Sequence, residues 1–120
     1  MKKIKTTNPE LIELIRFLRK QGRENKARIW RDVAEDLAKS KRRRVAVNLS
    51  HLNRHAQKNE TVVVPGKVLG AGEIDHPITV TAFAFSAKGR KKIEAAKGKC
   101  LSFVDLIKKN PRGSSVKIIG

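Results

Sequence analysis

The chain has 120 residues and a mass of 13.4 kDa, which is the size of one domain. It carries 28 Lys and Arg against 11 Asp and Glu, giving a formal net charge of +17. A compact chain with so large an excess of one sign repels itself, which predicts a polyanionic partner and disfavours a freely diffusing metabolic enzyme. With 39% hydrophobic residues we expect a single folded domain over residues 1–120, helical at 8–40 and β/α at 45–119.

The cysteine count and the amino terminus limit the compartment. The lone Cys100 excludes an internal disulfide and is most simply a small buried side chain in a reducing compartment. The lysines at the amino terminus are followed by polar residues, not by the apolar core of a signal peptide. No window approaches about 18 uninterrupted apolar residues. We therefore expect a cytoplasmic protein without a membrane partner.

Two helices are predicted at the amino end. The first starts at Asn8, whose side chain can cap it, with Pro9 suited to the first turn, and Gly22 is expected to end it. Apolar residues then repeat every three or four positions, as on one face of a helix. A second helix is predicted from about 25 to 39. The link of residues 21–24 is short enough to make the two an antiparallel pair.

The pattern changes from a helical period to an alternation of two after the arginine run that ends at Arg44. Pro65-Gly66 is predicted to close the second of the strands as a turn, and residues 67–69 can continue it beyond that turn. The strand beginning at Ile78 has apolar residues on both faces, which predicts a central position in the sheet. The predicted strands are 45–49, 61–64, 78–85 and 116–119.

Three strand-like stretches end in a serine, at Ser50, Ser86 and Ser102. Serine is a good helix cap because its hydroxyl accepts a free backbone N–H of the first turn. Ordinary capping explains this recurrence, since the spacings are unequal and do not indicate a solenoid. The short helices predicted are 50–57, 86–97 and 102–109. Together with the strands they predict the α+β class.

Few residues of the sequence could support catalysis or bind a metal ion. His51 and His55 lie four residues apart on a predicted helix, but no third ligand is near them in the sequence. We expect them at the surface beside Arg54, with possible contacts to phosphates or bases. Cys100 is flanked by Leu101, which indicates burial and not an activated thiol. We therefore expect no enzyme activity, no metal, no cofactor and no small-molecule substrate.

The segment Gly66–Gly72 follows a strand and superficially looks like a phosphate-binding loop. It does not end in Gly-Lys-Ser/Thr, no helix start follows it, and the dinucleotide-binding spacing is absent. A turn that needs flexible or positive-φ backbone is the better interpretation.

Basic runs are the positive signal. Five cations lie within Lys39–Arg44, and Lys88–Lys99 holds six cations with one acid, whereas residues 61–87 carry a net charge of −1. One such run is usually a solvated face, but several runs with a net charge of +17 favour nucleic acid. An anionic membrane is disfavoured because both amino-terminal helices use their apolar stripes for packing.

Residue patterns alone leave DNA and RNA open. The first two helices lack the third helix of a compact helix-turn-helix bundle. Phe83 and Phe85 alternate as base-stacking strand residues would, but the glycines and basic residues that flank them in such motifs are missing. The patterns therefore support a protein that reads the nucleic-acid backbone and fits its shape, and a DNA-compacting or chromatin-like basic protein and a small RNA-acting enzyme are kept as alternatives.

Several segments together match a known family. They are Asn8-Pro9 before a leucine-rich helix, Ile29–Ala34 (IWRDVA), Val47–Ser50 (VNLS), Val63–Gly72 (VVPGKVLGAG) and Pro111–Gly113 (PRG). In this order they resemble the archaeal and eukaryotic large-subunit ribosomal protein family numbered eighteen, of the "e" type. The likeness runs from about Asn8 to Ile119, and the PGKVLG run is its most specific part.

The resemblance implies a structural, noncatalytic protein of the cytoplasmic ribosome that docks onto large-subunit ribosomal RNA beside other ribosomal proteins. It also implies an irregular superhelix of strands and short helices, shared with universal ribosomal protein fifteen, and the short length favours an archaeal source. By the same resemblance, Lys67 with Gly66, Gly70 and Gly72 forms a loop whose backbone approaches RNA. The candidate RNA-binding residues are Lys2, Lys3, Lys5, Arg23, Lys26, Arg28, Arg31, Lys41, Arg42, Arg43, Arg44, Arg54, Lys67, Lys88, Arg90 and Lys91.

Overall fold

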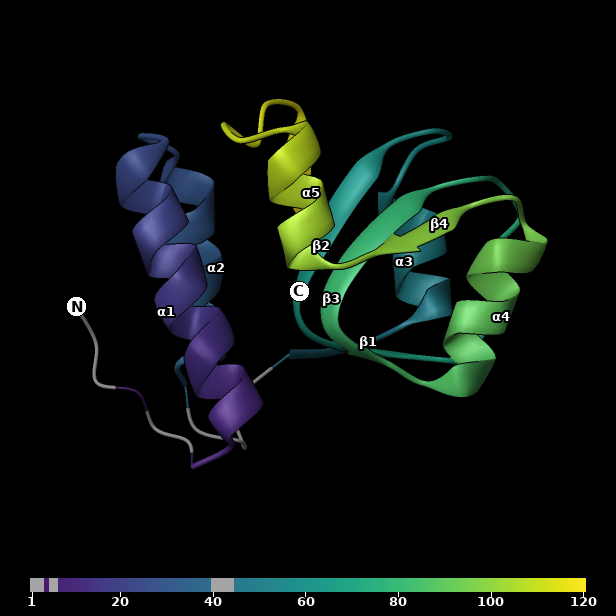
Figure 1. Cartoon of the computed structure of the whole chain (residues 1–120). Coiled ribbons are helices and arrows are strands. Elements are labelled where there is room, and N and C mark those ends of the chain that lie inside the picture. The colour runs from purple at the N-terminus through teal and green to yellow at the C-terminus, as the bar shows by residue number, and fades with distance from the viewer. Residues whose placement is uncertain (1–3, 5–6, 40–44) are drawn as a thin grey trace.

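The computed structural model describes Ile4, residues 7–39 and residues 45–120. In chain order the elements are α1 (Pro9–Glu24), α2 (Arg28–Leu37), β1 (Val45–Asn48), α3 (Leu49–His55), β2 (Thr61–Leu69), β3 (Thr79–Phe85), α4 (Ala87–Ala95), β4 (Lys99–Leu101), α5 (Phe103–Lys109) and β5 (Val116–Ile118) (Figure 1). The predicted α+β class and the amino-terminal antiparallel helix pair are confirmed.

Every strand pairing in the described residues is parallel, and β2 organises the sheet. The order is β1-β2-β3-β4, and β5 also pairs with β2. β5 pairs with the first half of β2, with Thr61 opposite Val116, whereas β1 pairs with the second half, with Gly66 opposite Val45. β3 lies between β2 and β4, so its predicted central position is confirmed.

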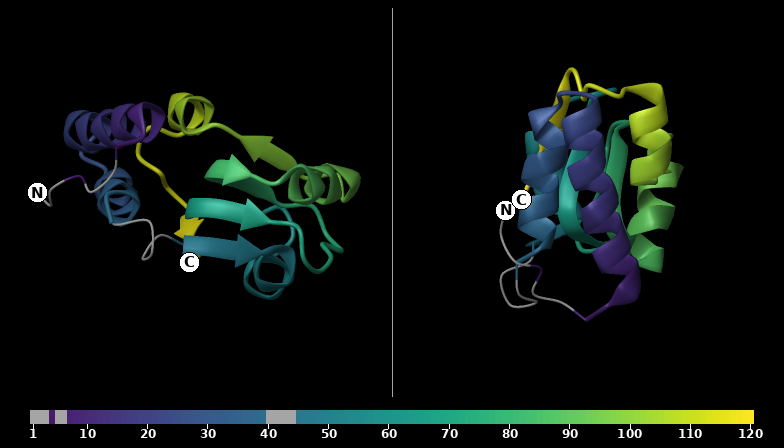
Figure 2. Two further views of the ribbon diagram at one scale, coloured as in Figure 1. Left: turned by 90° about the horizontal axis from the view of Figure 1, so that it is seen from below. Right: turned by 60° about the vertical axis from the view of Figure 1, so that its left-hand side comes forward.

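Helices cover both faces of the sheet, as parallel sheets require. One apolar cluster joins α1, α2 and α5 to the sheet through Val63, and Trp30 of α2 is completely buried in it. The other cluster packs α3 and α4 against Val62, Val64 and Val80. Figures 1 and 2 show α1, α2 and α5 on one side of the sheet and α3 and α4 on the other. The result is a three-layer arrangement.

Side-chain caps start three of the helices as predicted. Asn8 Oδ1 accepts the backbone N–H two residues ahead at 3.0 Å. The hydroxyls of Ser86 and Ser102 each accept the N–H three residues ahead, at 3.0 and 3.1 Å. The prediction for Ser50 is wrong, because α3 begins one residue earlier and the Ser50 N–H donates to the Ala71 carbonyl at 3.2 Å.

The expected end of the first helix is also wrong, since α1 continues past Gly22 to Glu24. Gly22 is instead the point where α2 approaches closely: a Cβ there would lie 2.4 Å from Cγ of Arg31. The link between the helices is therefore residues 25–27, and α2 begins at Arg28, three residues later than predicted. Arg19 and Glu35 form an ion pair of 2.9 Å across the pair.

Pro65-Gly66 lies inside β2 and does not form the predicted turn. The pairing of β2 with β3 shifts register between Val64 and Lys67, and this irregularity absorbs the proline, which has no N–H for a regular ladder. Gly66 is buried, and a Cβ on it would lie 1.9 Å from the Val45 carbonyl oxygen. Close contact with β1 therefore explains this glycine.

Candidate nucleic-acid interface

The predicted RNA-binding side chains of the described residues come from separate parts of the fold. All of them are exposed. One group lies at the end of the helix pair, a second group lies on α4, and Arg54 of α3 and Lys67 of β2 stand apart from both. The candidates that lie outside the described residues are Lys2, Lys3, Lys5, Lys41, Arg42, Arg43 and Arg44.

The first group surrounds the turn between α1 and α2. Arg23 lies in the last turn of α1, Lys26 in the link, and Arg28 and Arg31 in α2. Arg28 Nε lies 3.8 Å from Asp32 Oδ1, but the Arg28 side chain is 89% exposed, so this contact holds it only weakly. The turn therefore presents guanidinium and ammonium groups that are free to meet phosphates.

The second group lies on α4. Lys88 and Lys91 are three residues apart and therefore share a face of the helix. The Arg90 guanidinium lies 4.9 Å from the centre of the Phe85 ring, a cation–π contact that orients its side chain. The predicted cations of α4 are thus held on the surface of the helix layer formed by α3 and α4.

Lys67 does not join the α4 group. Successive side chains of a strand point to opposite faces, and Val68 packs in the α3–α4 cluster. Lys67 is therefore directed to the other face of the sheet, the one that carries the helix pair.

Gly70 and Gly72 are the other two glycines of the expected RNA loop. A Cβ at Gly70 would meet Lys88, and a Cβ at Gly72 would meet Ser50, so close packing within the protein occupies the space beside both glycines.

Lys92 was not among the predicted RNA-binding residues, and the structure gives it an internal role. Its ammonium group donates to the carbonyl oxygens of Gly70 at 3.3 Å and Gly72 at 2.8 Å. It also lies 3.0 Å from the Glu73 carboxylate. Lys92 therefore ties α4 to the segment that follows β2, and its charge is already paired.

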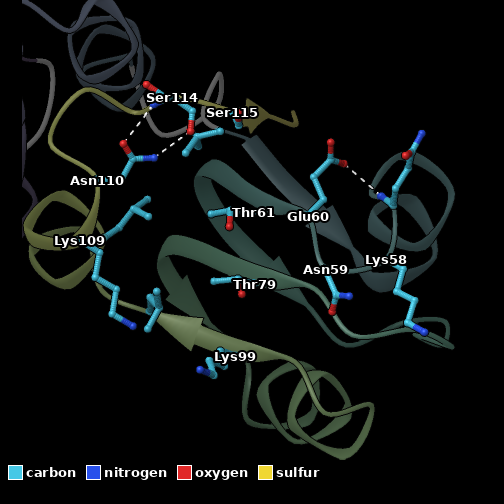
Figure 3. Close-up of a pocket in the computed structure, with 14 residues that line it drawn as sticks. Lys58, Asn59, Glu60, Thr61, Thr79, Lys99, Lys109, Asn110, Ser114 and Ser115 are labelled. Atoms are coloured by element: carbon cyan, nitrogen blue, oxygen red, sulfur yellow. Dashed lines mark hydrogen bonds between the residues drawn. The ribbon is translucent and has the colours of Figure 1, made fainter.

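Sequence reasoning missed a hollow of about 560 Å³ at the amino ends of β2, β3 and β4 (Figure 3). Lys58, Lys99 and Lys109 line it, all three are exposed, and none of their ammonium groups makes an ion pair or hydrogen bond with a described residue. They are far apart in sequence and meet because parallel strands begin at the same edge. In the sequence, Lys58 comes shortly before β2, Lys99 is the first residue of β4 and Lys109 is the last residue of α5. These positions at the ends of elements were the only sequence signal of the hollow.

The histidines and the cysteine show no arrangement suited to catalysis. The rings of His51 and His55 contact each other on α3 in a tilted arrangement, with centroids 4.4 Å apart and planes 49° apart. No group of three or more His, Cys, Asp or Glu side chains in the described residues could hold a metal ion. Burial raises the pKa of the Cys100 thiol, which is the opposite of what activates a thiolate.

His76 has a structural role. Its ring nitrogens lie 2.6 Å from Asp75 Oδ1 and 2.6 Å from the Ala56 carbonyl oxygen. Both partners are acceptors, so both bonds form together only when the imidazole is doubly protonated. The bond to Asp75, followed by the bond to Ala56, raises the pKa of His76 above 6.5. The protonated ring joins the segment before β3 to the end of α3.

We predict that His76 makes stability depend on pH. A raised pKa in the folded state gives stabilisation that is complete below the unfolded value of 6.5 and is lost as pH rises through the folded value. The difference in unfolding free energy between the wild type and His76→Gln should therefore shrink from about pH 6 to about pH 9 in urea titrations. His55→Gln is the control and should keep the wild-type dependence. A constant difference across this range would contradict the assignment.

Comparison with known proteins identifies the family. The family model described as "Ribosomal protein 60S L18 and 50S L18e" matches residues 1–120. The chain belongs to this ribosomal-protein family. No helix in the described part of the chain is long and apolar enough to span a membrane.

Individual relatives of the L18/L18e family agree along the whole chain. The "Large ribosomal subunit protein eL18" of Methanothermobacter thermautotrophicus is 50% identical over 119 residues, 99% of this chain and 98% of the relative. Proteins of the same name from Methanococcus maripaludis and Archaeoglobus fulgidus are 48% and 44% identical, over 99% and 97% of this chain and 99% of each relative. These are ribosomal proteins of archaea and not enzymes, which confirms the expected family and noncatalytic class. The DNA-compacting alternative finds no support.

Proposed function

We propose that this chain is a structural constituent of the large ribosomal subunit that binds ribosomal RNA by neutralising phosphates. Family membership supports the place in the large subunit, because this chain matches large-subunit ribosomal proteins over nearly the whole length of both. The observation that supports phosphate neutralisation is that the predicted cations of the described residues are exposed on both helix layers. The chain has only 11 Asp and Glu to pair with its 28 Lys and Arg. Lysine and arginine that meet phosphates release counterions and fix the protein's position on the RNA.

The rigid body determines where those charges lie. The cations at the α1–α2 turn and those on α4 project from opposite helix layers, with the sheet between them. A protein charged on both sides can hold together RNA segments that would otherwise repel each other. Its partners in this proposal are large-subunit ribosomal RNA and neighbouring ribosomal proteins.

The arginine run is the sharpest test of phosphate neutralisation. Changing Arg42, Arg43 and Arg44 together to Ala should lower the slope of log affinity against log salt by about two to three, since each phosphate contact contributes about 0.7 to 0.9. Binding is measured by filter retention of large-subunit RNA across a salt series. An unchanged slope would remove this run from the interface.

A charge-matched variant is the control for the arginine run. Changing Arg16, Lys97 and Lys108 to Gln removes the same charge elsewhere and should keep the wild-type salt slope.

Sedimentation tests the assembly. The tagged wild-type chain should sediment with the large subunit in a cell lysate. Sedimentation apart from ribosomal subunits, or equal binding to long duplex DNA at matched salt, would overturn the proposed function.

A further inference from the structure

We propose that an unpaired segment of ribosomal RNA crosses the amino edge of the sheet and places one base in the hollow between the strand ends and α5. This inference rests on the proposed function and adds a specific RNA contact to it. We call the hollow at the amino ends of β2, β3 and β4 the edge hollow. Its volume of about 560 Å³ falls within the range of sites that enclose small ligands, about 300 to 1,000 Å³.

A second hollow of about 570 Å³ adjoins the first and extends the surface toward the helix pair. The two share Lys109, Asn110 and Ser114, and the second adds Lys26 and Arg112. The shared residues form the boundary between the hollows. A chain of nucleotides that leaves the edge hollow over this boundary therefore meets further cations at the α1–α2 turn.

The charge of this surface favours an anionic occupant. Lys58, Lys99 and Lys109 line the edge hollow, and Glu60 is its only acidic lining residue among those described. The Glu60 carboxylate is engaged, because it accepts the Gln57 N–H at 3.0 Å. In Figure 3 the labelled lysines stand around the hollow while Glu60 turns toward its own loop. The positive charge is left for an external partner.

The interior of the edge hollow suits a base better than a phosphate. Leu101, Leu106 and Val116 supply apolar surface, and the hydroxyls of Thr61 and Thr79 can donate or accept hydrogen bonds. A paired base inside a duplex does not reach such a site, whereas an unpaired base can be turned outward and bound through its edges. A single-stranded segment is therefore the form of RNA that fits.

The boundary between the hollows is held in place before any ligand binds. The Asn110 amide donates to the Ser114 carbonyl at 2.8 Å and accepts the Ser114 N–H at 3.2 Å. Trp30 Nε1 donates to the Pro111 carbonyl at 2.7 Å and anchors the same loop to the helix pair. A preformed surface loses less conformational entropy on binding, so these bonds favour a specific contact.

Crosslinking locates the contact. The wild-type chain is bound to large-subunit ribosomal RNA, irradiated and digested, and the peptides that carry nucleotides are identified by mass spectrometry. We expect adducts in the peptides spanning 57–61 and 109–116. Adducts confined to other parts of a chain that binds RNA would overturn this inference and leave the proposed function standing. Failure to bind the RNA at all would overturn both.

Charge removal tests the rim of the edge hollow. The variant Lys58→Gln/Lys99→Gln/Lys109→Gln should lower the salt slope by about two, because each single-strand phosphate contact contributes about 0.7. If the two proteins bind equally at about 1 M salt, the variant should bind roughly a hundredfold more weakly than the wild type at about 0.1 M salt. The control Arg16→Gln/Lys97→Gln/Lys108→Gln removes equal charge outside both hollows, with Lys108 adjacent to Lys109 on α5. Equal effects of the two variants would overturn the inference.

Filling the hollow tests the base. Thr79→Phe places a ring in the edge hollow and leaves every lysine in place. Binding should weaken about tenfold with an unchanged salt slope, because a base contact is lost and no phosphate contact is. Thermal unfolding confirms that the variant is folded. Wild-type affinity in the folded Thr79→Phe protein would exclude a base from the hollow.

Discussion

Replacing Gly66 with Ala is expected to destabilise the protein by about 3 kcal/mol, the upper part of the range for overpacked interiors. The added Cβ would lie 1.9 Å from the Val45 carbonyl oxygen and 2.8 Å from its carbon. These are backbone atoms, so no side-chain rotation relieves the clash. β1 must move away from β2, and the pairs from Val45–Gly66 to Asn48–Leu69 weaken together.

The measurement is the free energy of unfolding from urea titration, compared with Lys67→Ala. Lys67 is the next residue of the same strand, also pairs with β1, and has an exposed side chain. Its truncation should change stability by less than about 0.5 kcal/mol. If Gly66→Ala unfolds at the same urea concentration as this control, the close contact with β1 is not needed for stability.

The contrast between Gly66 and the caps shows which parts of the fold are encoded locally. Asn8, Ser86 and Ser102 act on N–H groups two or three residues away, so a short stretch of sequence is enough to predict the helix starts. Pro65-Gly66 is a turn signal by the same local rules. Here, the pairing of Gly66 with β1 and of the flanking Val64 and Lys67 with β3 overrides it, and those partner strands lie in distant parts of the chain.

The same distinction applies to the candidate interface. Cations that cluster in the sequence, such as Lys88 and Lys91, are recognised without the fold. Lys58, Lys99 and Lys109 belong to different elements or loops and become neighbours only through the parallel order of the strands. Conversely, Lys92 lies within a basic run, yet two carbonyl groups and Glu73 bind its charge. Sequence density of charge thus predicts the kind of partner better than the individual contacts.

Trp30→Ala is expected to cost about 3 to 5 kcal/mol, a large part of the total stability of a typical domain. Trp30 is completely buried between the helix pair and the α5–β5 loop, so its removal leaves a cavity in the cluster that also contains Phe103. The Pro111 carbonyl loses its donor as well. Trp30→Phe keeps most of the apolar contact and should cost less, about 1 to 3 kcal/mol, chiefly from the lost bond and the smaller ring.

The pair of variants separates packing from anchoring of the loop. Gly113 has a φ of +66°, and a Cβ on it would lie 2.4 Å from Ile29 Cγ2, so the loop rests directly on α2 beside Trp30. In Trp30→Phe the fold should persist while amide exchange at residues 112–115 speeds up, because the loop has lost its hydrogen bond to the helix pair. Unchanged exchange in this loop would show that packing around Gly113 holds it without the indole N–H.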